Sequence, residues 1–148
     1  MASMTDVVQQ HELFNQISEA TFMTIVDVFT NRFIRGDKHT DIEVTRFKLC
    51  TLAYCKHIRD YGTEPRMYAD VYEPVATRSG LYAEVIRSPV AKCIKKSWHS
   101  VFHNFYESAF WTPTFVPTNN LHTPPVNKVF MRRAAASVAT FISVSYLK

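Results

Sequence analysis

The residues best suited to chemistry are basic and form two clusters. Arg132 and Arg133 are adjacent in "VFMRRAAASVATF", and Lys92, Lys95 and Lys96 lie close together in "VAKCIKKSWH". Arginine clamps phosphate through two parallel hydrogen bonds, and lysine binds it as a point charge. No acidic residue lies between positions 85 and 106. Both clusters are therefore candidate anion sites; the alternatives are a solvated charged face for the lysines and pairing with distant carboxylates for the arginines.

The histidines and cysteines give a weaker indication of chemistry. His99 and His103 are four residues apart, the spacing of two metal ligands on one helix face. Ser100, however, stands where the zinc-protease pattern requires Glu, and no third ligand is near in the sequence. Cys55 and Cys93 fall on apolar stripes, where buried thiols are ordinary core residues. Since no acid, base and nucleophile set is visible, we expect no metal, no cofactor and no enzymatic activity.

Length and composition describe a single globular domain spanning residues 1–148. Hydrophobic residues make up 47% and charged residues 20%, with a net charge of +4. This basic charge favours an anionic partner such as RNA, DNA or a phospholipid surface. The three cysteines cannot all pair, and the polar start shows no signal peptide, so we expect free thiols in a reducing, cytosolic environment. No apolar run is long enough to predict a membrane span.

The elements that must position these clusters are mainly helices. Thr40 and Glu43 have the spacing of a capping box at the start of the second helix. Asn127 or Thr123 is expected to cap the last one. The short link between the first two helices predicts that they are antiparallel neighbours. Apolar residues recur at helical spacing over residues 8–34, 41–60, 81–110 and 127–147.

One segment, residues 63–78, has a different pattern. Met67, Ala69 and Val71 alternate with more polar neighbours, and Pro65 and Pro74 bound the run. Alternation is the period of a β-strand, so we expect a short extended hairpin there. The predicted fold is therefore all-α, a four-helix bundle with a short extended hairpin between helices 2 and 3.

A second irregular segment, residues 111–126, contains four of the seven prolines and no charged residue. Phe110, Trp111 and Phe115 stand in or beside it. Exposed aromatic rings in a long loop are typical of a contact surface, and filling of the core is the alternative. We therefore expect these three rings to form an interface, either between copies of the chain or with a protein partner.

Two stretches, "VIRSPVAKCIKKSWHSVF" and "RRAAASVATFISVSYL", separated by a long loop, resemble the coat proteins of rod-shaped plant RNA viruses of the tobamovirus type. The resemblance implies a four-helix subunit that polymerises helically along single-stranded RNA, found in the virion and the host cytoplasm. It also implies RNA contacts for Arg132 and Arg133. Two departures exist: Ala134 and Ala135 replace the acidic residues usual after the double arginine, and residues 104–120 hold no Arg or Lys. The second departure moves the expected RNA site toward Lys92, Lys95 and Lys96.

Together these observations predict a homo-oligomeric, capsid-type or nucleoprotein subunit. It would coat single-stranded RNA without sequence specificity by neutralising phosphates with the two basic clusters. The alternative is a small helical interaction protein, such as a viral accessory factor or adaptor, that binds a protein partner through its aromatic loop.

Overall fold

Most of the chain that the structure describes is helical. The computed structural model describes residues 6–34, 39–98 and 123–146. These ranges contain six α-helices and no strand, which confirms the all-α class. The α-helices are α1 (Val7–Phe14), α2 (Glu19–Phe33), α3 (Asp41–Tyr61), α4 (Glu73–Arg78), α5 (Arg87–Trp98) and α7 (Asn127–Phe141). Three short helical segments accompany them: η1 (Met67–Tyr72), η2 (Ala83–Val85) and η3 (Ile142–Tyr146).

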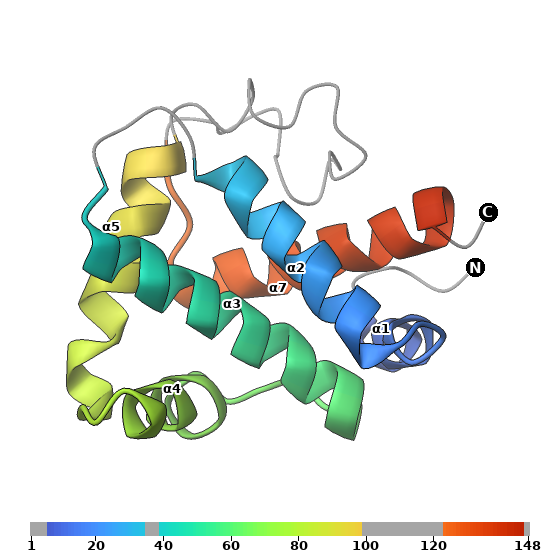
Figure 1. Ribbon diagram of the computed structural model, residues 1–148, viewed down its shortest axis with the longest axis horizontal. Coiled ribbons are helices and arrows are strands. Elements are labelled where there is room, and N and C mark those ends of the chain that lie inside the picture. Colours follow the sequence, from blue (N-terminus) through green and yellow to red (C-terminus); the bar gives the residue numbers. More distant parts are fainter. Residues whose placement is uncertain (1–5, 35–38, 99–122, 147–148) are drawn as a thin grey trace.

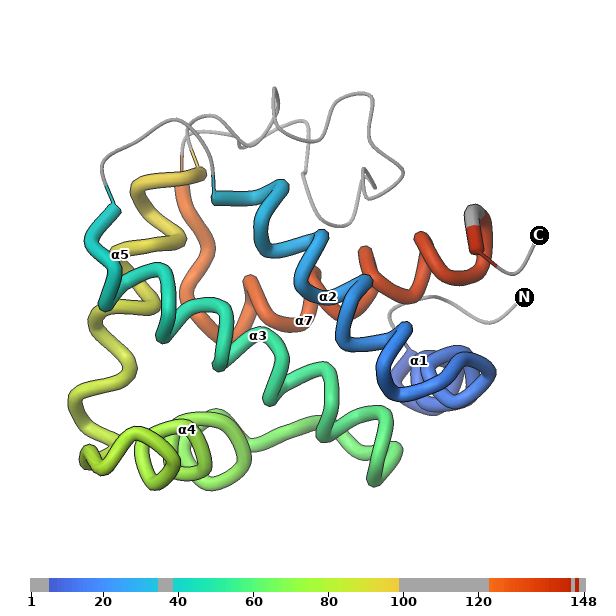
Figure 2. Tube along the Cα trace, viewed as in Figure 1, coloured from blue at the N-terminus to red at the C-terminus, as the bar shows by residue number. Residues whose placement is uncertain are grey.

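Helices α2 and α3 lie side by side and run in opposite directions, as the short link between them predicted (Figure 1). Helix α7 crosses behind both of them, and α5 stands at the end where α3 begins (Figure 2). Aromatic rings join the three crossing helices: the Phe130 ring centroid is 4.8 Å from that of Phe33 and 5.4 Å from that of Phe47. Such ring pairs contribute stabilisation beyond the apolar area that they bury.

Helix α7 is the most enclosed helix of the described fold. Ala134, Ala135, Ala136 and Ser137 are each at most 2% exposed. Small side chains allow neighbouring backbones to approach, and α7 packs against α1, α2, α3 and α5. The small residues after the double arginine therefore leave room for the neighbouring helices to approach α7.

The first predicted helix, residues 8–34, is two helices in the structure. Ser18 is extended and its hydroxyl accepts a hydrogen bond from the Thr21 N–H at 3.1 Å, which caps α2. Ile17 before this cap and Phe22 in the first turn are both buried, in the positions of a hydrophobic staple. Because the apolar spacing continues across Ser18, the sequence pattern did not reveal the N-cap at this position.

The predicted extended hairpin is wrong. Residues 67–78 form a π-helical turn, η1, that runs directly into α4. The buried residues of this stretch are Val71, Tyr72, Val75 and Ala76, which repeat at four residues rather than two. Pro74 lies in the first turn of α4, where its missing N–H is tolerated. The apparent strand alternation came from tyrosines, which are amphipathic and fit either face of a helix.

The two predicted helix caps have different outcomes. At α3 the capping box is confirmed: the Glu43 N–H donates to the Thr40 hydroxyl, and the Thr40 N–H donates to the Glu43 carboxylate, both at 3.1 Å. At α7 the predicted cap is wrong, because Val126 occupies the cap position. Asn127 is buried instead, and its amide donates to the Tyr72 hydroxyl at 2.9 Å and to the Arg87 carbonyl at 3.2 Å. This side chain ties the start of α7 to η1 and α5.

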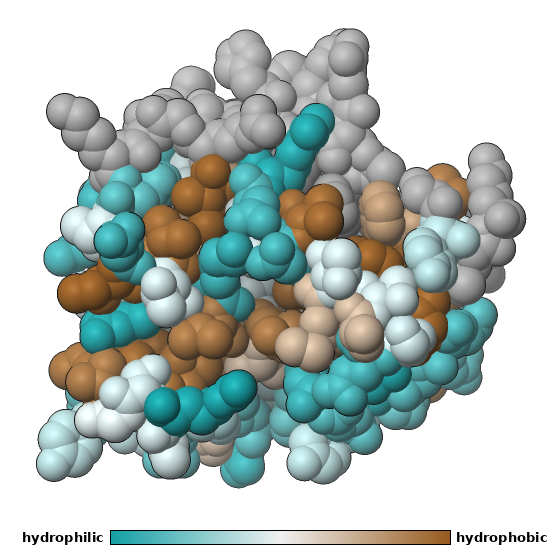
Figure 3. All heavy atoms as spheres, in the orientation of Figure 1, coloured by the Kyte–Doolittle hydropathy of each residue, from teal (hydrophilic) through white to brown (hydrophobic). Residues whose placement is uncertain are grey.

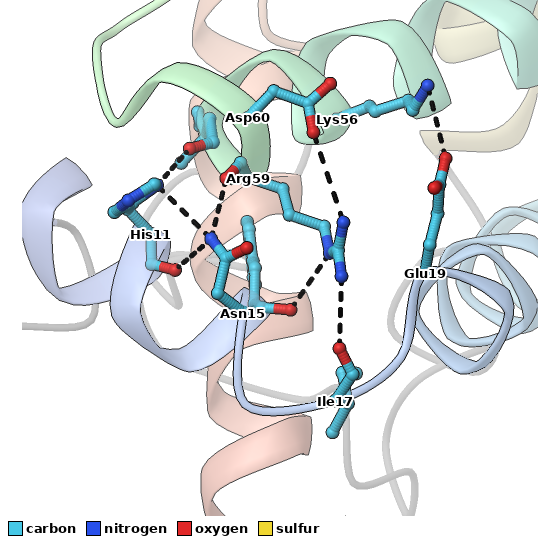
Figure 4. Close-up of polar contacts among 9 residues, drawn as sticks. His11, Asn15, Ile17, Glu19, Lys56, Arg59 and Asp60 are labelled. Carbon is cyan, nitrogen blue, oxygen red and sulfur yellow. Dashed lines mark hydrogen bonds and ion pairs between the residues drawn. The ribbon is translucent and has the colours of Figure 1, made fainter.

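The junction between α1 and the end of α3 is dense in polar contacts (Figure 4). His11 Nδ1 lies 2.9 Å from the Ile58 carbonyl oxygen, and the Asn15 amide donates to the Arg59 carbonyl at 2.6 Å. In return, the Arg59 guanidinium donates to the carbonyls of Phe14 and Ile17, each at 3.1 Å. Carbonyl groups at the ends of α1 and α3, and the Ile17 carbonyl in the link to α2, are satisfied in this way.

Candidate nucleic-acid interface

Helix α5 carries a basic exposed face. Its four cations are Arg87, Lys92, Lys95 and Lys96, and it contains no carboxylate. The opposite face is buried and packs against α3. Lys92 and Lys95 are exposed and form no ion pair with any residue in the described ranges. No carboxylate of the described ranges therefore neutralises these two charges.

Lys96 differs from these two lysines because it is bound within the fold. Its ammonium donates to the Glu43 carboxylate at 2.7 Å, and the Glu43 side chain is only 8% exposed. The Lys96 hydrogen bond, followed by that of the Thr40 N–H, lowers the pKa of Glu43. The same carboxylate thus completes the capping box of α3 and neutralises one of the three predicted lysines.

Arg132 is also bound within the fold. Its guanidinium makes a hydrogen-bonded ion pair with Glu64, which raises the pKa of Arg132. It also reaches the hydroxyl of the buried Tyr54. Pairing with a distant carboxylate is therefore what the structure shows for this arginine, whose side chain stays about half exposed.

Arg133 points in a different direction from Arg132, because adjacent helical residues are about 100° apart. It is partly buried, and this burial lowers its pKa. No carboxylate within the described ranges pairs with it. The double arginine therefore does not act as a single clamp: one guanidinium is occupied, and the other is partly shielded from solvent.

The structure does not bring the two basic clusters together. Lys96 binds Glu43 in the first turn of α3, whereas Arg132 reaches Tyr54 farther along the same helix. At the rise of an α-helix, these two contact points are about 16 Å apart. A single phosphate therefore cannot bridge the lysine and arginine clusters.

The predicted aromatic interface, Phe110, Trp111 and Phe115, lies outside the described residues, as do His99 and His103. The three cysteines, Cys50, Cys55 and Cys93, are free and buried; free thiols were predicted for all three, and core positions for Cys55 and Cys93. Burial raises the pKa of each thiol to about 12. The thiolate is the nucleophilic form, so these residues are suited to the core and not to covalent catalysis.

Sequence reasoning missed one polar contact beside the lysines. The Ser97 hydroxyl oxygen lies 3.0 Å from His39 Nε2, and this contact links α5 to the residue before the α3 cap. Ser97 is completely buried, so the pair ties two helices together and is not an accessible nucleophile. The two residues are 58 positions apart, and no local pattern marks them as a pair. Among the residues that the structure describes, no three metal-ligating side chains lie together.

Comparison with known proteins places the chain in no group: no family model, no curated protein and no solved structure matches it. None of the helices described has both the length and the apolar composition of a membrane-crossing segment.

Proposed function

We propose that this chain is a self-associating, non-enzymatic subunit that binds single-stranded RNA without sequence specificity. The observation that carries this proposal is the exposed face of α5, where Lys92 and Lys95 have no carboxylate on their own helix and no ion pair in the described structure. Lysines placed in this way neutralise phosphates and release counterions, whatever the base sequence.

In this proposal the four longer helices, α2, α3, α5 and α7, make up the four-helix body of the subunit. Lys92 and Lys95 provide the primary contacts. Arg133 adds a weaker contact because it is partly buried. Arg132 and Lys96 contribute only if phosphate replaces Glu64 or Glu43, so their share of RNA binding is the smallest. The subunit would act in a virion and in the host cytoplasm.

The decisive experiment compares two double variants that remove the same charge. Lys92→Gln/Lys95→Gln removes the two unpaired lysines. Lys48→Gln/Lys56→Gln removes two lysines that pair with Asp27 and Glu19. Binding of a fluorescent single-stranded oligonucleotide is measured by anisotropy from low to moderate salt. The slope of log affinity against log salt should become shallower by about 0.7 for each lost phosphate contact in the α5 variant only.

Equal losses in the two double variants would show that only net charge matters and would contradict a site on α5. Binding that is insensitive to salt would contradict phosphate neutralisation altogether. Arg132→Ala/Arg133→Ala should weaken binding less than the α5 variant, because Arg132 already has an internal carboxylate partner.

A further inference from the structure

One end of the molecule exposes an apolar patch, here called the η2 patch, formed by Ile42, Leu81, Tyr82 and Val85. These side chains are 55%, 37%, 81% and 44% exposed, respectively. Two of them, Ile42 and Leu81, line a groove between the first turns of α3 and the segment before η2, together with Asp41, Thr45, Arg46 and Ser79. In Figure 3 hydrophobic residues are visible at the end of the molecule where α3 begins, and others continue across the same face. Contiguous exposed apolar surface of this kind is typical of an interaction site.

Polar contacts hold the η2 patch in place. The Arg46 guanidinium donates to the Val85 carbonyl at 3.2 Å, and the Tyr68 hydroxyl donates to the Glu84 carboxylate at 3.1 Å. The Leu81 N–H donates to the Ala76 carbonyl at 2.8 Å. The apolar side chains are therefore held outward by a backbone that is anchored at several points, which reduces the entropy lost on binding.

The opposite end exposes a second apolar group, here called the α1 patch, formed by Val8, Val144 and Tyr146. These side chains are 60%, 52% and 49% exposed. Helix α1 contacts η3, so the three residues belong to one end of the molecule, beside the two termini (Figure 1).

The chain segments that carry the two patches have net charges of opposite sign. Residues 6–18 contain two carboxylates, Asp6 and Glu12, and no Lys or Arg. Residues 78–96 contain five Lys or Arg and one carboxylate, Glu84, which accepts the Tyr68 hydrogen bond. Further carboxylates lie near the η2 patch: Asp41 in the groove, Glu43 in the first turn of α3, which binds Lys96, and Glu73, which acts on Tyr68. With Arg46 in the groove, the Lys and Arg residues still outnumber these carboxylates. Opposite potentials of this kind steer two surfaces together and set their orientation.

The two patches cannot meet within one chain. Ile42 lies in the first turn of α3, whereas His11 of α1 contacts the Ile58 carbonyl near the end of the same helix. These points are about 24 Å apart along a continuous helix. We propose that the η2 patch of one copy binds the α1 patch of the next copy, in a head-to-tail contact. This inference rests on the self-association part of the proposed function and does not depend on RNA binding.

A head-to-tail contact uses two different surfaces, so it can be tested by complementation between variants. Tyr82→Asp disables only the η2 patch, and Val144→Asp disables only the α1 patch. Val28→Asp, at a side chain that is 47% exposed on α2, is the matched control. All four proteins are full-length and free of RNA, and sedimentation velocity is recorded over a range of concentrations, with circular dichroism to confirm folding.

The unmodified chain and Val28→Asp should form species larger than dimers as concentration rises. Each patch variant alone should remain monomeric. An equimolar mixture of the two should form a one-to-one dimer and nothing larger, because each copy retains one usable surface. A mixture that stays monomeric would overturn the proposal, as would assembly by either variant alone. An unmodified chain that stays monomeric at every concentration would also overturn it and would assign the η2 patch to a different protein.

The RNA experiment fails or succeeds separately from this one. The monomeric variants keep Lys92 and Lys95, so they should bind a short single-stranded oligonucleotide with the salt slope of the unmodified chain. If they do and the mixture does not dimerise, the head-to-tail contact is wrong while the α5 site stands. If the mixture dimerises and the lysine variants bind RNA normally, the α5 site is wrong while the contact stands.

Discussion

The basic residues at the α1–α3 junction and those on the exposed face of α5 differ in what they contact. Arg59 donates to two backbone carbonyls and lies over the Phe22 ring, with its guanidinium carbon 5.7 Å from the ring centroid. Lys92 and Lys95 have no such partner in the described part of the chain. A basic side chain that finds a hydrogen-bond acceptor within the fold, as Arg59 does, has a structural role. A basic side chain without such an acceptor, such as Lys92 or Lys95, can bind a ligand. The number of basic residues in a stretch of sequence does not distinguish the two cases.

Substitution of Arg59 should have the largest effect on stability. Arg59→Met keeps the apolar stem but leaves the Phe14 and Ile17 carbonyls without their donor. We expect a loss of about 2–3 kcal/mol in the free energy of unfolding, measured with urea. Lys56→Met, three positions earlier on α3, is the control because its ion pair with Glu19 is exposed. Equal losses of unfolding free energy in Arg59→Met and Lys56→Met would contradict a special structural role for Arg59.

Gly62, which ends α3, allows a test of the backbone conformation at the junction between α1 and α3. Gly62 and Gly80 both have φ of +69°, but a Cβ at Gly62 would lie 3.2 Å from the His11 ring, whereas one at Gly80 would meet nothing within 4 Å. Gly80→Ala should therefore lower the free energy of unfolding by only about 1 kcal/mol, because alanine disfavours the left-handed backbone conformation at this position. Gly62→Ala should cost about 2 kcal/mol, since His11 must also move. Identical unfolding free energies would show that His11 packing contributes nothing.

Lys96 lies on α5, but like Arg59 it has a partner within the fold, the Glu43 carboxylate. The variant Glu43→Gln therefore tests how much this internal ion pair stabilises the protein. The amide still accepts the Thr40 N–H but loses the charge that pairs with Lys96. We expect a loss of about 1 kcal/mol or less at neutral pH. Because the pKa of Glu43 is lowered in the fold, this contribution is complete above the ordinary glutamate pKa of about 4.3 and disappears as the pH falls through the lower folded value. Urea unfolding at pH 7 and pH 3 should show a smaller difference between the two proteins at pH 3 than at pH 7.

Substitution of Lys95, next to Lys96 on α5, should have the smallest effect on stability. Lys95→Met should change the unfolding free energy by no more than about 0.5 kcal/mol, because the side chain is exposed and unpaired. Lys96→Met should destabilise the fold by breaking the bond to Glu43. The order should reverse for RNA: Lys95→Met weakens binding and Lys96→Met changes it less. A Lys95 variant that unfolds more easily than the Lys96 variant would contradict this assignment.

Parts of the fold governed by local rules could be predicted from the sequence. The α3 capping box depends on residues three positions apart, and the buried stripe of α3 follows helical spacing. The break at Ser18 was missed because Ile17 and Phe22 continue the apolar stripe across it. The false hairpin arose because a tyrosine-rich stretch alternates in polarity while its buried residues repeat at helical spacing.

The candidate site was predictable only in part. The absence of carboxylates near Lys92 and Lys95 is visible in the sequence, and it favoured a basic face. The partners of the other cations are distant: Arg132 and Glu64 are 68 residues apart, and Lys96 and Glu43 are 53 apart. Such pairs depend on how helices pack, so no local pattern could separate the occupied cations from the available ones.

The polar junction at the end of α3 also has a consequence for the order in which the chain folds during synthesis. Helix α1 has only eight residues, too few to be stable alone in water. His11 and Asn15 contact carbonyls that lie 47 and 44 residues later in the chain. Helix α1 is therefore expected to remain unstructured until α3 has emerged from the ribosome and can receive it, so α1 joins the fold after a helix that is synthesised later.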